Sequence, residues 1–166
     1  DHFTDPISFW AGKLELSEEQ IRAQIVDAPK FQNTIRAKLM KRGGVGYTQP
    51  GPDTFPSIEE FNRLIIACGA LPCATWLDGM SSGEQSMEEL LGLLIVKGAA
   101  ALNIIPDRNW NISDPEVRRM KVQKLYEVVE LAQKLDLPLN IGTEMNSYGQ
   151  KLVDDFAVPE LSPIRQ

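Results

Sequence analysis

The feature that most constrains the fold is a regular alternation of helix starts and short apolar runs between residues 57 and 141. Two capping boxes, Ser57-Ile58-Glu59-Glu60 and Ser86-Met87-Glu88-Glu89, predict the first turns of two helices, because their side chains satisfy the free amides there. Asp114-Pro115 predicts the start of a third, longer helix. Apolar runs that predict strands follow at 70–76, 99–105 and 137–141. This order predicts a parallel sheet with right-handed helical crossovers.

The residues before 57 complete the expected architecture. Val45-Gly46-Tyr47-Thr48-Gln49 predicts a first short strand. A capping box at Ser17 and the four-residue spacing of Phe31, Ile35 and Leu39 predict a helical pair over 17–43. Residues 1–16 show no clear period and predict an irregular segment. We expect a single α/β domain over 1–166, in which the helical pair precedes repeated strand–helix units over 44–150. Because four parallel strands are about half of an eight-stranded barrel, the predicted fold class is a parallel-stranded partial (β/α) barrel of the TIM type.

Two further expectations concern the edges of the sheet and the C-terminal tail. Unpaired sheet edges are covered or paired in natural proteins, so either residues 1–44, a missing N-terminal segment or a second copy covers them. We expect a homo-oligomer or an N-terminal segment missing from this sequence. The tail after Asp154 contains prolines and is expected to be loosely held.

Composition and charge narrow the class of partner. The net charge is -6 and there is no basic run, which argues against a nucleic-acid partner. No apolar stretch long enough for a membrane span and no signal peptide are evident. Two cysteines, Cys68 and Cys73, are too few for a disulfide scaffold, so we expect reduced thiols and a cytoplasmic location. A phosphorylated small molecule stays compatible with this charge, because a local arginine or a helix N-terminus can bind phosphate.

Polar side chains follow the expected strands, at the edge where parallel α/β sheets carry their functional groups. Asp78, Asp107 and Glu144 are the carboxylates of this edge. Carboxylate oxygens bind hard divalent cations, or they act as general acid and base. The alternative for Asp78 and Asp107 is turn formation, and the alternative for Glu144 is capping of backbone amides.

The same edge carries groups suited to binding a substrate. Arg108 can hold a phosphate or a carboxylate through two hydrogen bonds, or it can form a solvated salt bridge. Trp76 and Trp110 can form the apolar walls of a pocket, or they can pack in the core.

Histidine content limits the chemistry. His2 is the only histidine, whereas zinc and two-metal hydrolase sites generally use several imidazole ligands. The sequence also has no glycine-rich phosphate loop and no cysteine–histidine dyad. These absences argue against a self-sufficient hydrolase of those types.

Four motifs, taken in order over residues 29–147, resemble the C-terminal part of the PHP (polymerase and histidinol phosphatase) superfamily of metal-dependent phosphoesterases. A helix over 31–43 ends in a glycine, as in that family, and the run 65–72 is similar to its helix-Gly-Gly-strand unit. The run 98–105 resembles its Gly-x-x-x-Ile-Glu-Val-Tyr strand. Gly142-Thr143-Glu144-Met145-Asn146 resembles its Gly-Ser-Asp-x-His.

The resemblance implies a barrel-like fold and a hydrolase that uses a divalent metal (Mn, Mg or Zn), with Glu144 as a ligand and Asp107 beside it. The sequence departs from the family pattern at several ligand positions. Trp76 stands where the family has a ligand histidine, Asn103 where it has a glutamate, and Asn146 where it has a final histidine. The N-terminal His-x-His strand of the family is absent.

Three functional hypotheses follow. The first is a portion of a metal-dependent phosphoester hydrolase of unknown substrate, inactive as this fragment alone, with Asp107 and Glu144 as catalytic residues and Asp78 in the substrate site. The second is a non-catalytic small-molecule-binding domain whose pocket is lined by Trp76, Arg108, Trp110 and Asn146. The third is an assembly domain that pairs through its open sheet edges.

Overall fold

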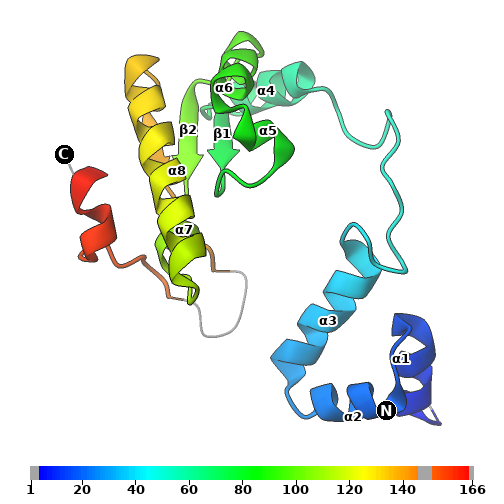
Figure 1. Cartoon of the computed structure of the whole chain (residues 1–166). Helices are drawn as coiled ribbons and strands as arrows, with labels where there is room; N and C mark the ends of the chain where they lie inside the picture. The colour runs from blue at the N-terminus through cyan, green and yellow to red at the C-terminus, as the bar shows by residue number, and fades with distance from the viewer. Residues whose placement is uncertain (1–3, 146–150, 165–166) are drawn as a thin grey trace. The chain divides into compact units, whose positions relative to one another are not determined.

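The computed structural model describes residues 4–145 and 151–164 and divides into two compact units, Asp1–Phe55 and Pro56–Gln166 (Figure 1). The single domain expected over 1–166 stays a prediction. Within the described ranges, no helix combines the length and the apolar character that crossing a bilayer requires.

The first unit is a small helical cluster. Its core is formed by Leu14, Ile21 and Phe31, one residue from each helix. A side-chain cap precedes every helix, so each helix start is encoded locally. The helices are α1 (Pro6–Leu14), α2 (Glu18–Ile25) and α3 (Ala28–Met40). The last two confirm the helical pair expected over 17–43.

Helix α1 corrects the irregular segment expected over residues 1–16. The Asp5 carboxylate accepts hydrogen bonds from the amides of Ile7 and Ser8, both at 3.1 Å. Pro6 takes the first helical position, where a missing N–H has no cost. This is the same signal that Asp114-Pro115 carries later in the chain. The local sequence therefore encodes α1, although its apolar residues show no clear period.

No strand forms over residues 45–49, so the first expected strand is wrong. The Gly46 amide instead donates to the Lys38 carbonyl of α3 at 3.0 Å. A Cβ at Gly46 would lie 3.0 Å from the Leu39 Cα, so the backbone packs directly against the helix. Glycine thus lets this segment fold back on α3 rather than extend into a sheet.

The second unit carries the sheet. Its helices and strands alternate as the sequence predicts from residue 57 onward, with two additional short helices after the first two strands. The elements are α4 (Ile58–Ala67), β1 (Cys73–Trp76), α5 (Ser82–Gln85), α6 (Met87–Val96), β2 (Ala101–Ile104), α7 (Asp107–Trp110), α8 (Pro115–Lys134), β3 (Leu139–Ile141) and the 3₁₀ helix η1 (Pro159–Ile164).

The sheet is open and has three parallel strands in the order β1-β2-β3. Trp76 aligns with Ile104, and Ile104 aligns with Ile141, so all three strands end at one edge. The predicted partial barrel of the TIM type is therefore wrong. The described chain is mostly helical and carries a small open sheet, and it is α/β only at the coarse level. The strand missing at 45–49 accounts for part of this difference.

One side of the sheet faces the main core. Strand residues that alternate along β1 and β2 pack with residues of α6, α8 and η1. The other side carries a polar row, Thr75, Asn103 and Asn140, which are aligned across the three strands. Asn140 Nδ2 donates to Asn103 Oδ1 at 2.6 Å. The buried residues of the core are Trp76, Leu91, Leu102, Ile104, Leu125, Val128, Ala132 and Leu161.

Helix α4 packs through polar residues. Asn62 is buried and donates through Nδ2 to the Lys97 carbonyl at 2.8 Å, and Glu59 forms an ion pair with the Lys97 side chain. Phe61 and Leu64 are exposed on the same helix. The contact of α4 with the chain after α6 is therefore made by hydrogen bonds and charge rather than by its apolar side.

Candidate functional site

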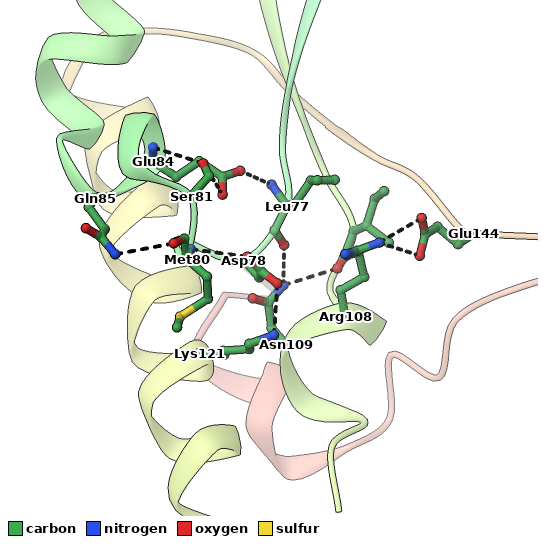
Figure 2. Close-up of polar contacts among 11 residues, drawn as sticks. Leu77, Asp78, Met80, Ser81, Glu84, Gln85, Arg108, Asn109, Lys121 and Glu144 are labelled. Atoms are coloured by element: carbon green, nitrogen blue, oxygen red, sulfur yellow. Dashed lines mark hydrogen bonds and ion pairs between the residues drawn. The ribbon is translucent and has the colours of Figure 1, made fainter. Parts of the chain in front are cut away.

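The candidate site lies at the carboxyl-terminal edge of the sheet, where polar side chains from three segments are joined by hydrogen bonds and ion pairs (Figure 2). The loop after β1, the short helix α7 after β2, and the residues after β3 all start from this edge. We call this set of segments the carboxyl edge.

The loop after β1 is held by two carboxylates with structural partners. Asp78 accepts from the Met80 amide at 3.2 Å and pairs with Lys121 of α8 at 2.8 Å. Glu84 is buried, and it accepts from the Leu77 amide at 2.6 Å. The arrangement favours the alternative assigned to Asp78, that of a turn residue, and it adds a bond to α8 (Figure 2).

Asn109 connects the ends of β1 and β2. It is fully buried on α7, and its Nδ2 donates to the carbonyls of Leu77 at 3.1 Å and Ile105 at 3.2 Å. Its Oδ1 is buried and has no hydrogen-bond partner among the described residues. The amide group therefore positions α7 against the preceding strand end, a role that the sequence analysis missed.

Arg108 joins α7 to the segment after β3. Its Nη1 lies 2.9 Å from both carboxylate oxygens of Glu144, and both side chains are about one-third exposed, at 35% and 27%. The Nε atom of Arg108 is buried without a hydrogen-bond partner among the described residues. The structure thus brings together two of the predicted site residues and leaves the Nε donor of the guanidinium unpaired within the described chain.

Asp107 begins α7 and contacts a carboxylate from the C-terminal segment. Its amide donates to Asp154 Oδ2 at 3.2 Å, and its own Oδ2 accepts from Asn111 Nδ2 at 3.2 Å. The Oδ1 atom of Asp107 is buried without a partner among the described residues. Asp107 is therefore both the first residue of the helix and a carboxylate with an unused acceptor.

Asp154 is the second functional candidate that the sequence analysis missed. Its residue is only 6% exposed, and burial is the main cause that raises its pKa above the ordinary value of 3.8. The negative charge of Asp107 raises this pKa further, whereas hydrogen bonds from the Asp107 amide and the Thr143 side chain lower it. Two carboxylates in different environments therefore adjoin at α7, an arrangement that acid–base sites use.

Replacing Asp154 by asparagine is expected to change how stability depends on pH. Because the folded-state pKa of Asp154 is raised, its protonated form favours folding at low pH, and that stability is lost as the pH rises through the folded-state pKa. Asp154→Asn lacks this loss, so the unfolding free energy of the variant relative to wild type should increase as the pH rises from 3 to 7. Urea unfolding at several pH values measures it, and a difference that is constant with pH contradicts the prediction.

The two tryptophans have structural positions. Trp76 is 1% exposed within the main core, and Trp110 is partly buried and packs against the same core. These positions favour the core-packing alternative over pocket walls. Asn146, the remaining predicted substrate-binding residue, lies outside the described residues.

The described residues do not fit the divalent metal that the family resemblance implies. No group of three or more histidine, cysteine, aspartate or glutamate side chains in this part of the chain could hold a metal ion. Asp78 pairs with Lys121, and Glu144 pairs with Arg108, so each carboxylate already faces a cation.

Comparison with known proteins gives no match to a family model, to a curated protein or to a solved structure. The PHP resemblance of residues 29–147 therefore stays a prediction from sequence motifs.

Proposed function

We propose that the carboxyl edge binds a phosphorylated small molecule and forms part of a hydrolase site for phosphoester bonds. One observation supports this most directly: Arg108 Nε and Asp107 Oδ1, a donor and an acceptor on consecutive residues, are both buried without partners among the described residues. Leaving a buried polar atom unpaired costs about 1–3 kcal/mol, so a ligand or ordered water is expected to satisfy these atoms.

A phosphate group that carries one proton has the complementary pattern. Its charged oxygens accept hydrogen bonds from the Arg108 guanidinium, and its hydroxyl donates to the Asp107 carboxylate. Arginine suits this contact because its planar donors match the spacing of phosphate oxygens. In the proposal, Glu144 orients the guanidinium through Nη1 and leaves Nε for the ligand.

Hydrolysis would use the same groups. A water oxygen would attack the phosphorus and the ester P–O bond to the leaving alcohol would break. Asp107 would take a proton from the attacking water and pass a proton to the leaving oxygen, and Arg108 would stabilise the negative charge on the phosphoryl group. Asp154 acts as a positioning residue, because its carboxylate accepts the hydrogen bond of the Asp107 amide. The phosphoester substrate class itself comes from the sequence resemblance.

Replacing Arg108 by glutamine is expected to weaken phosphate binding about tenfold to hundredfold. Hydrogen bonds to a charged group contribute about 1.5–3 kcal/mol, and the variant loses the charge while keeping a polar side chain. Titration of phenyl phosphate into the full chain, followed by NMR chemical shifts, measures the affinity. Arg36→Gln, which changes an exposed arginine of α3, is the matched control. Equal affinity in wild type and Arg108→Gln would refute the proposed site.

A ligand-binding domain without catalysis is the second candidate function. The absence of a metal-ligand group among the described residues favours it, because a phosphoester hydrolase of the resembled type depends on metal ions. Phenol release from phenyl phosphate separates the two functions. Release by wild type that is lost in Asp107→Asn, with binding retained, supports the hydrolase; binding without any release supports the second candidate.

A further inference from the structure

The segment after the last strand is anchored in the core at its far end. Leu161 of η1 is 1% exposed and belongs to the main core, and Val158 and Ile164 pack against that core. The tail was expected to be loosely held from Asp154 onward, so this anchoring corrects that expectation. We call residues 151–164 the clasp.

Polar bonds connect the same end of the clasp to α8. The Tyr126 hydroxyl donates to the Glu160 carbonyl at 2.5 Å, and Arg118 Nη1 lies 3.6 Å from Glu160 Oε1. The Tyr126 contact is made to a backbone atom, so it fixes the path of the clasp and not only a side chain. Helix α8 therefore holds the clasp by both apolar and polar contacts.

The near end of the clasp reaches the candidate site. Asp154, which is almost fully buried, accepts the Asp107 amide hydrogen at 3.2 Å and interacts with Thr143 after β3. Only seven positions separate Asp154 from Leu161 in the sequence. A short segment thus links the surface of α8 to the first amide of α7.

We propose that the clasp regulates the carboxyl edge, because its docking on α8 determines whether Asp154 caps α7 and holds Asp107 and Arg108 in place. Proteins open locally as well as globally, and a surface segment can open at a lower free-energy cost than the whole domain. When the far end of the clasp is released, Asp154 leaves the Asp107 amide and α7 loses its cap. The consequence for ligand binding rests on the function proposed above, whereas the coupling of the two ends does not.

Amide hydrogen exchange of the full chain tests the coupling. Tyr126→Phe removes one hydrogen bond from the clasp, and we expect about threefold to tenfold faster exchange, both within 158–164 and at the Asp107 amide. Leu161→Ala, which empties a core position, should accelerate the same amides more. Tyr47→Phe, at a tyrosine in the first unit, is the matched control.

Two outcomes would refute the proposed coupling. In the first, exchange at 158–164 becomes faster while the Asp107 amide keeps its wild-type rate. In the second, neither variant changes the exchange of either region. Phenyl phosphate titration of the same samples separates this inference from the proposed function. Coupled exchange with no phosphate binding in any sample supports the proposed role of the clasp and refutes the ligand site. Coupled exchange with weakened binding in both variants supports the two proposals together.

Discussion

Replacing Trp76 by alanine is expected to lower the unfolding free energy of the second unit by about 3–5 kcal/mol, the range for buried aromatic side chains. The indole is 1% exposed and belongs to the same core as Leu91 of α6, Leu102 of β2 and Leu125 of α8. Because these neighbours come from three separate elements, they cannot all move to fill the space that alanine leaves. Urea unfolding followed by circular dichroism measures the loss.

Two further variants show whether the lost stability comes from the empty core position. Trp76→Phe keeps most of the apolar volume and removes a buried Nε1–H that has no partner among the described residues, so it should destabilise less than alanine. Trp110→Ala, at a partly buried position, should also destabilise less. A Trp76→Ala protein with nearly wild-type stability but weakened phenyl phosphate binding would restore the pocket-wall role predicted from the sequence.

Replacing Asn109 by aspartate is expected to lower the unfolding free energy at pH 7 by about 4 kcal/mol. The carboxylate would face the carbonyls of Leu77 and Ile105 in a fully buried position, where no cation of the described chain forms a hydrogen bond or ion pair with this side chain. The side chain must then stay protonated in the folded state. Holding a carboxyl protonated about three pH units above its ordinary pKa costs about 4 kcal/mol.

The effect of Asn109→Asp should depend on pH in a defined direction. Its folded-state pKa is raised, so stability is present at low pH, where the protonated carboxyl donates one hydrogen bond, and is lost as the pH rises. Asn109→Leu removes the same donor without a charge, so its cost should not vary with pH. Asn33→Asp, at an exposed position of α3, is the matched surface control. If Asn109→Asp were equally destabilised at pH 4 and pH 7, a buried charge would not be the cause.

Local signals account for most of the fold that could be predicted. The capping boxes expected at Ser57 and Ser17 form with reciprocal hydrogen bonds. The box expected at Ser86 does not form: Ser86 also ends α5, and its side chain makes no capping hydrogen bond to α6. The strand predicted over 45–49 does not form, because this segment packs against the end of α3 through Gly46. A short run with strand-like composition does not reveal whether a neighbouring strand exists to pair with it.

The candidate site could be predicted only in part, because some of its contacts join residues that are far apart in the sequence. The rule that polar groups gather at the ends of parallel strands located Asp107, Arg108 and Glu144, and the structure joins the last two directly. Asp154 gave no local signal, since its partner amide lies 47 positions earlier. Glu84 did give one: Ser81 and Glu84 have the spacing of a capping box, and the Ser81 oxygen accepts from the Glu84 amide.

In an amphipathic helix, the apolar positions usually tolerate substitution least. In α4, the polar positions should tolerate it least. Its contacts with Lys97 use Asn62 and Glu59, so exchanging these polar residues for apolar ones would leave the Lys97 carbonyl and ammonium group without these partners. Phe61 and Leu64 can vary without disturbing those bonds. Across relatives of this chain, the polar positions of α4 should therefore be the invariant ones, and its large apolar positions should drift.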